Sequence, residues 1–429
     1  MLKFQQLSSI ALITALLACT SSSRSTISPA LTSAPAVKIV NGKWFDGSAF
    51  HARAVYMRQG VFVAPPSRDP DSVIDLRGGF VLAPFAEAHN HNFDASSPES
   101  ARALVAKYVK DGVFYGQNPA NVLRARHGLE GFINIPTGID VTFSNAALTG
   151  PGGHPLGLFL RNLGRGAMFA TDTNTAAGFI WIIRNKEDLD KKWPMILSSH
   201  PDFIKVILAY SDEYAKRLAD SSTFNWRGFD PRLLPDLVSR AHSAGRRVMA
   251  HVESAADFRN AVMSGVDIVG HTPGFRGNEQ TQLPDFEPYL VSDVDAEDAA
   301  RRGTYVVTTL GGIVGVPDTA LRRRADSLFV LNLRTLKRHN VRVIIGSDSY
   351  RDTSVPEALY LSSLGVYSNA ELLRAWTEVT PQSIFPKRKI GRLENGYESS
   401  FIVLDGDPLA DFANVKRIKL RVKQGFEIQ

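Results

Sequence analysis

The middle of the chain alternates short apolar runs with amphipathic stretches, and this alternation limits the folds that it can adopt. Eight apolar runs of strand length are present, the first in "VLAPFAEAHNH" and the last in "NVRVIIGSDS". Between them lie helical patterns such as "SPESARALVAKYVKDG", "LLPDLVSRAHSAG" and "AADFRNAVMSG", each ending in Gly as helices tend to do. Eight strand–helix units over about 310 residues predict an α/β protein with a (β/α)8 TIM-type barrel and insertions.

The two ends of the folded part have a different pattern. Residues 37–83 and 393–429 contain alternating runs broken by Gly, Asn and Asp, such as "VKIVNGKWFDG" and "KRIKLRVKQGFEI". Such runs predict β-strands joined in hairpins. We therefore expect one small β-sandwich domain formed from both terminal segments, beside a (β/α)8 barrel of residues 84–392.

The first residues have the pattern of an export signal. One Lys, an apolar run from Ile10 to Leu17 and the ending Ala18-Cys19 predict a lipoprotein-type signal peptide over residues 1–19. The alternative is a plain cleaved signal with an incidental cysteine. Residues 20–36 are rich in Ser, Thr, Ala and Pro and predict a flexible tether.

This pattern predicts where the protein works. We expect export to the periplasmic face of a membrane, with a lipid anchor at Cys19. Thr20 is not the Asp that is typical of inner-membrane retention, which favours an outer-membrane lipoprotein. Because Cys19 is the only cysteine, the mature chain has no intrachain disulfide, and any metal must be held by other side chains.

Composition narrows the class of partner. With 44% hydrophobic and 21% charged residues the chain is typical of a globular protein. Its net charge is +6, but the densest basic run, Arg322 to Arg324, has no interleaved aromatic residues and indicates a solvated helix face. We therefore expect a small-molecule substrate and no nucleic acid.

Polar side chains follow the predicted strands at one end of the barrel. His89 and His91 are two residues apart, so they point the same way from a strand. His251, His271 and Asp348 end or follow three later strands. For each histidine taken singly, the alternative to a site role is a core or loop residue whose hydrogen bonds are satisfied. For Asp348 the alternative is a helix cap. Their joint placement at the C-terminal ends of the strands favours a metal site, because active sites of such barrels lie there.

Lys205 is the unusual member of the fourth strand. In "DFIKVIL" it shares one face with Phe203 and Ile207, and both faces of a barrel strand are buried. A buried lysine is costly unless it is paired or neutralised. One alternative is a lysine that reaches the rim or an acid; the other is a lysine carboxylated by CO₂ that bridges two metal ions.

The order His-x-His, Lys, His, His, Asp along strands one, four, five, six and eight resembles the amidohydrolase superfamily of metal-dependent hydrolases. The context, including "LTGPGGHP" after strand three, resembles its imidazolonepropionase-like and prolidase-like branch over about residues 37–429. The resemblance implies two zinc ions per subunit, with other divalent metals as alternatives, bridged by carboxylated Lys205. It implies these metal ligands: His89, His91, Lys205, His251, His271 and Asp348.

One departure from the family pattern lies beside the first two histidines. Members commonly read Pro-Gly-x-x-Asp there, whereas this chain has Ala83, Pro84 and Glu87. The acid is kept, but its longer arm is expected to seat His89 differently.

The resemblance implies a binuclear metal-dependent hydrolase of amide bonds, acting by metal hydroxide without a Ser or Cys nucleophile. Dipeptides or N-acyl amino acids are the expected substrates, and Asp348 is expected to move the proton. His154, in the Gly-rich loop, is a second catalytic candidate that contacts substrate, or else a turn histidine. Tyr210 and Tyr214 either line the pocket or pack, and Thr309 has no assigned role.

Two other functions stay open. The same metal centre serves lactone or organophosphate ester hydrolysis, so the substrate is an amide or an ester. A catalytically inactive, lipid-anchored binding protein is the remaining alternative, and the intact set of six site residues argues against it. A homo-oligomer is neither required nor excluded by the sequence.

Overall fold

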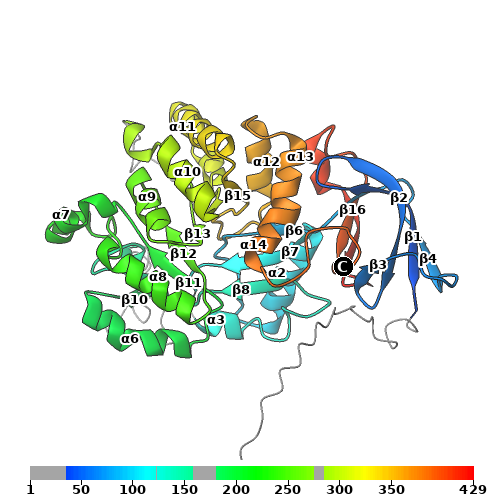
Figure 1. Ribbon diagram of the computed structural model, residues 1–429, viewed down its shortest axis with the longest axis horizontal. Coiled ribbons are helices and arrows are strands. Elements are labelled where there is room, and N and C mark those ends of the chain that lie inside the picture. The colour runs from blue at the N-terminus through cyan, green and yellow to red at the C-terminus, as the bar shows by residue number, and fades with distance from the viewer. Residues whose placement is uncertain (1–34, 122, 158–179, 275–284) are drawn as a thin grey trace, which may run out of the picture. The chain divides into compact units, whose positions relative to one another are not determined.

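The computed structural model describes residues 35–121, 123–157, 180–274 and 285–429 (Figure 1). These ranges belong to one compact unit that runs from Pro35 to Gln429. The predicted signal peptide, Cys19 and nearly all of the predicted tether lie outside the described residues. Within the described ranges, no helix combines the length and the apolar character that a membrane span needs.

One sheet unites the two ends of this unit. Its strand order is β18-β17-β16-β5-β1-β2-β3, with β4 beside β1. The strands are β1 (Val37–Phe45), β2 (Phe50–Arg58), β3 (Val61–Val63), β4 (Ser72–Asp75), β5 (Phe80–Leu82), β16 (Phe401–Leu404), β17 (Ile418–Lys423) and β18 (Phe426–Glu427). Strand β5 joins the halves, because Val81 pairs with Trp44 on one side and Val403 on the other. The rings of Trp44 and Phe401 lie 5.6 Å apart in the small core of this domain.

The barrel follows directly after β5. Its strands are β6 (Phe85–Glu87), β7 (Val113–Asn118), β8 (Asp140–Phe143), β9 (Ala147–Thr149), β11 (Ile204–Ile207), β12 (Val248–His251), β13 (Ile268–Val269), β14 (Tyr305–Val307) and β15 (Arg342–Ile344). Every pairing among them is parallel. Strand β8 lies within the apolar run "GIDVTFSNA" that the sequence offers as the third strand, and β9 follows this run. Strand β8 pairs with β7, and β9 pairs with β11. A further short strand, β10 (Ile180–Ile182), pairs with β9.

Backbone hydrogen bonds join the two parallel sheets into a closed barrel. Between β8 and β11, the Asp202 amide donates to the Phe143 carbonyl at 2.8 Å. Between the last and first strands, the amide of Ala88 donates to the Ile345 carbonyl at 2.9 Å. The predicted TIM-type barrel with an additional β-domain is therefore confirmed.

Helices lie between successive strands, as the sequence predicted (Figure 1). They are α2 (Pro98–Lys110), α3 (Leu123–His127), α6 (Lys186–Ser198), α7 (Tyr214–Ala219), α8 (Leu234–Ser243), α9 (Ala255–Met263), α10 (Asp293–Arg302), α11 (Thr319–Arg338), α12 (Val355–Ser363), α13 (Asn369–Arg374) and α14 (Thr380–Ile384). Capping boxes begin α2 at Ser97 and α9 at Ser254. Gly112, Gly245 and Gly265, which end the three quoted helical stretches, have φ of 73°, 68° and 84°, a left-handed backbone that glycine adopts without strain.

The barrel interior is filled by apolar side chains below the level of Lys205. Phe203, Met249, Ile268, Val307 and Ile344 are all buried and form one cluster inside the strands. Because side chains alternate along β11, this cluster places the next inward side chain, Lys205, one layer closer to the C-terminal mouth.

A buried ionic network connects the β-domain with the barrel. The ammonium of Lys423, on β17, lies 2.6 Å from a carboxylate oxygen of Asp140, on β8. Arg388 contacts the other oxygen of Asp140 at 2.8 Å and Glu398 at 2.7 Å.

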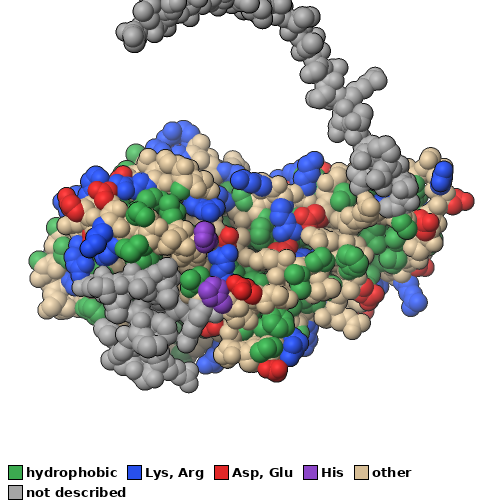
Figure 2. Space-filling model, turned by 90° about the horizontal axis from the view of Figure 1, so that it is seen from below, with side chains coloured by type: hydrophobic (Ala, Val, Ile, Leu, Met, Phe, Trp, Pro, Cys, Tyr) green, Lys and Arg blue, Asp and Glu red, His purple; other side chains and the backbone are tan. Residues whose placement is uncertain are grey.

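Elsewhere, on the face that Figure 2 shows, basic and acidic side chains are interspersed.

Candidate metal centre

The structure brings the predicted site histidines together at the C-terminal ends of the strands. The ring centroids of His89 and His91 lie 5.2 Å apart, and those of His89 and His271 lie 4.5 Å apart. His251 follows at 4.5 Å from His271, with its ring nearly perpendicular at 75°. Residues separated by up to 182 positions in the sequence (89 and 271) therefore share one mouth because their strands end at the same edge.

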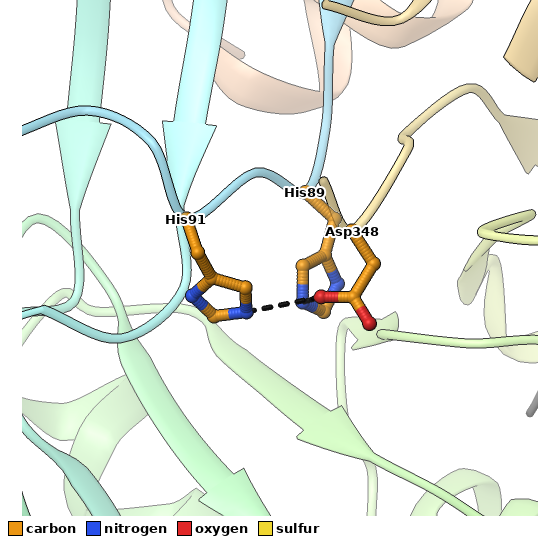
Figure 3. Close-up of side chains that lie close together, drawn as sticks. All are labelled: His89, His91 and Asp348. Atoms are coloured by element: carbon orange, nitrogen blue, oxygen red, sulfur yellow. Dashed lines mark ion pairs between the residues drawn. The ribbon is translucent and has the colours of Figure 1, made fainter. Parts of the chain in front are cut away.

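Asp348 completes one half of this cluster (Figure 3). Its Oδ1 atom lies 3.1 Å from Nε2 of His91 and 3.5 Å from Nε2 of His89. One nitrogen of each histidine and one oxygen of the aspartate lie within 4.8 Å of one another. Two imidazoles and a carboxylate at this spacing are a donor set that a divalent cation such as zinc accepts.

The main chain fixes the rings of His89 and His91. Nδ1 of His89 lies 2.9 Å from the Gly270 carbonyl oxygen, and Nδ1 of His91 lies 3.2 Å from that of Ala120. A carbonyl only accepts, so each Nδ1 carries the hydrogen and each Nε2 keeps its lone pair. Burial, with a further contribution from the charge of Lys205, holds the pKa of His89 well below its usual range.

Lys205 is buried among these groups. Its side chain is 2% exposed, and among the described residues its Nζ has no hydrogen-bond partner. Burial lowers the pKa of Lys205 to about 7, against the opposing charge of Asp348. A Cβ atom at Gly270 would lie 3.0 Å from this Nζ, so the glycine keeps the space beside the amine.

His251 and His154 lie on the other side of the cluster. Nε2 of His251 is 2.9 Å from Oε1 of Glu253. This ring therefore differs from His89, in which Nδ1 is the nitrogen that lies beside an oxygen. The ring of His154 stacks on that of His251 at 4.9 Å and is itself 6% exposed. The Gly-rich loop therefore does carry His154 to the mouth.

Glu87 acts on the main chain beside His89, whose backbone amide donates to it. One carboxylate oxygen accepts from the amides of His89 at 3.1 Å and Ser347 at 2.9 Å. The other accepts from the Ser347 hydroxyl at 2.7 Å and the Asn90 side chain at 3.2 Å. Burial raises the pKa of Glu87 to about 8, although these four hydrogen bonds oppose the rise. The acid thus ties the end of β6 to the end of β15.

Sequence reasoning missed several residues of the mouth. Glu253 was assigned no role, although its position two residues after His251 placed it on the same side of the chain. Thr309, to which no role was assigned, has its hydroxyl 2.9 Å from Nδ1 of His271. Tyr350 stacks on His91 at 5.2 Å while remaining 65% exposed.

The two tyrosines named from the sequence differ in their surroundings. The hydroxyl of Tyr210 lies 3.3 Å from that of Tyr289, and the charge of Glu253 contributes to a raised pKa of Tyr210, after burial. Tyr214 is buried at the start of α7.

A closed barrel with imidazole, amine and carboxylate groups at its C-terminal mouth has these groups where the active sites of such barrels lie, and imidazole and carboxylate are ligand types that bind zinc. The model of the amidohydrolase family matches residues 198–426, more than half of the chain, and the chain belongs to this family. The protein is accordingly a hydrolase acting on carbon–nitrogen bonds, and the resemblance to the amidohydrolase superfamily is confirmed.

Solved structures with the same fold include several enzymes. Ochratoxinase of A. niger is 19% identical over 92% of this chain and 95% of its own, with a TM-score of 0.69. A prolidase complexed with N-methylphosphonate-L-proline is 18% identical over 92% and 99%, with a TM-score of 0.68. A Xaa-Pro dipeptidase with bound methionine is 17% identical over 91% and 99%, with a TM-score of 0.67. No curated protein matches the chain in sequence.

The residues of the mouth fit the divalent metals that this family generally uses. The group of His89, His91 and Asp348 offers three ligand atoms within 4.8 Å. Beside it lies the buried Nζ of Lys205, which has no hydrogen-bond partner among the described residues. Cations at this position would offset the burial of these polar groups.

We predict that Glu87→Ala weakens zinc binding by about 10–100-fold, because the substitution releases the segment that carries His89. Zinc affinity is measured by competition with a chelator. The control is Asp295→Ala, which removes a buried carboxylate paired with Arg259 on the outer helices. Wild-type affinity in folded Glu87→Ala would show that Glu87 does not position the site.

Proposed function

We propose that this protein is a binuclear zinc hydrolase that cleaves the amide bond of dipeptides or N-acyl amino acids. One observation carries the proposal: Lys205 is 2% exposed, has no hydrogen-bond partner among the described residues, and lies close enough to His89 and Asp348 to interact with their charges. A lysine paired with an acid at the rim, the alternative left open by the sequence, would have a carboxylate at hydrogen-bond distance.

Carboxylation explains why a lysine stands at this point of the barrel. The neutral amine attacks CO₂, a C–N bond forms, and one proton leaves, which gives an anionic carbamate with two oxygens. Desolvation favours the neutral amine that this reaction needs. We propose that the carbamate of Lys205 bridges two cations, one held by the group of His89, His91 and Asp348 and the other by His251 and His271.

The two cations, when bound, supply a Lewis acid and lower the pKa of water. The chain supplies the proton transfers. Asp348 lies at the mouth beside His91, where it can accept a proton from the attacking water and pass it to the leaving amine. We propose that His154, whose ring stacks on that of His251, donates to the oxygen of the scissile carbonyl.

The substrate class is inferred from two of the solved structures. One bears the name prolidase and the other Xaa-Pro dipeptidase, and both extend over at least 91% of this chain. At 17–18% identity they support the shared fold. Dipeptides and N-acyl amino acids are therefore the first compounds to assay with the zinc-loaded protein, and lactones and phosphotriesters the comparison. Hydrolysis of the esters alone would contradict the proposed amidase function.

We predict that Lys205→Ala loses metal and activity together, because the bridge between the cations is gone. Formate or acetate, by entering the vacated space, should restore part of the activity. The control is Lys192→Ala, since Lys192 lies on α6 and is also buried, but its ammonium bonds to Asp188 and to the Ile182 carbonyl. Two bound zinc ions and full activity in Lys205→Ala would eliminate the carbamate.

We predict that Asp348→Asn keeps much of its metal but loses about 10²–10⁴-fold in turnover, the usual worth of general acid–base help. Asn still offers an oxygen to the metal but accepts a proton poorly. The control is Asp352→Asn, since Asp352 is largely exposed and pairs with Lys107. Metal content and turnover are measured on the same samples, and wild-type turnover in Asp348→Asn would remove Asp348 from the mechanism.

We also propose that the protein is lipidated at Cys19 and held on the periplasmic side of the outer membrane. The apolar run and the Ala-Cys ending support this proposal, and both lie outside the described residues. Intact-mass analysis of membrane-extracted protein should give a chain that begins at Cys19 with added acyl mass. A mature chain beginning after Cys19, or one without acyl mass, would contradict it.

A further inference from the structure

We infer that Thr309 is a positioning residue that fixes the tautomer of His271, so that Nε2 of this ring is its metal-binding nitrogen. The inference rests on the proposed metal centre. It adds to that centre a residue just beyond the C-terminal end of β14, where no metal ligand was expected. Thr309 follows the last residue of β14 by two positions and is 3% exposed.

Two short contacts of the Thr309 hydroxyl carry the inference. Its oxygen lies 2.9 Å from Nδ1 of His271, and the hydroxyl donates to the Thr308 carbonyl at 2.8 Å. A hydroxyl has one proton, and a carbonyl has none to give. We infer that the hydroxyl gives this proton to the Thr308 carbonyl, so that its oxygen accepts from His271 and Nδ1 carries the hydrogen. A neutral imidazole has only one N–H, which leaves the lone pair on Nε2.

The same arrangement occurs at two neighbouring histidines. His89 and His91 also direct Nδ1 at an oxygen that accepts, in their cases the backbone carbonyls of Gly270 and Ala120. A main-chain carbonyl cannot be removed by substitution. His271 differs because its Nδ1 partner is a side chain, and this makes the effect of the tautomer accessible to mutation.

The backbone holds the Thr309 hydroxyl in place. Thr309 has φ of +53°, a conformation that is strained for a β-branched residue. Its amide donates to the Gly346 carbonyl at 3.0 Å. The amides of the next two residues, Leu310 and Gly311, both donate to the carboxylate of Glu357, which is 1% exposed. Hydrogen bonds from three successive amides thus hold this strained backbone, which indicates that the direction of the Thr309 side chain matters.

The test compares zinc binding by folded variants of the full chain. Thr309→Val keeps the shape and the β-branch but has no hydroxyl, while Thr309→Ala removes the hydroxyl together with the β-branched strain. Thr309→Ser keeps the hydroxyl and should restore binding. The matched control is Thr304→Val at the other end of β14, because Thr304 is also buried and donates to a backbone carbonyl, that of Val266, at 3.3 Å.

Zinc affinity and stoichiometry are measured by chelator competition and elemental analysis, beside the thermal midpoint. We predict that Thr309→Val and Thr309→Ala bind one of two zinc ions about 10–100-fold more weakly, the usual effect of losing such a partner. Thr309→Ser and Thr304→Val should match the wild type.

The possible results separate the inference from the proposed function. Wild-type affinity for both ions in Thr309→Val and Thr309→Ala would overturn the role of Thr309 and leave the metal centre intact. An equal loss in Thr304→Val would reduce Thr309 to a structural residue and overturn it as well. A wild-type protein that binds no zinc would instead overturn the proposed function itself.

Discussion

The closure of the barrel between its first and last strands is the constraint on which the site depends. The Asp348 amide donates to the His89 carbonyl at 2.7 Å, and Glu87 accepts from the amides of both His89 and Ser347. These contacts join segments about 260 residues apart in the sequence. Because the same short segments carry His89, His91 and Asp348, closing the barrel and assembling these three ligand atoms are one event. A defect in closure is therefore also a defect in the site.

The mouth concentrates groups that are costly to bury. Lys205 and His89 are almost fully buried, and burial lowers the pKa of both. The carboxyl of Glu357 is also buried, and burial raises its pKa to about 7. Hydrogen bonds from backbone amides offset the cost of burying Glu357, and a hydrogen bond to a backbone carbonyl does so for one nitrogen of His89. Lys205 has no such partner among the described residues. The fold thus holds a destabilising arrangement at its functional end, above an apolar cluster that stabilises the barrel interior.

The sequence was sufficient for the barrel, because strand and helix periods repeat and their helix ends carry caps such as Ser254 and Gly265. It also indicated which side chains converge, since parallel strands end at one edge. The sequence did not indicate which ring nitrogen of each histidine contacts a neighbouring oxygen. The contacts of His271 with Thr309 and of His251 with Glu253 depend on rotamers and loop conformations, which no period in the sequence encodes. Strand β9, which lies just after the predicted third strand, was missed for a similar reason, since it is defined by pairing with β11 while β8 pairs with β7.

The central claim is that two cations are bridged at Lys205. A crystal structure of the zinc-loaded protein, with anomalous scattering measured at the zinc edge, tests it most directly. The account predicts two zinc peaks about 3.5–4 Å apart, as in other two-metal hydrolytic sites. It predicts that one peak lies beside His89, His91 and Asp348, and that additional density continues from Nζ of Lys205 to both. A single peak, or two peaks with an unmodified Lys205 that touches neither, would contradict the account.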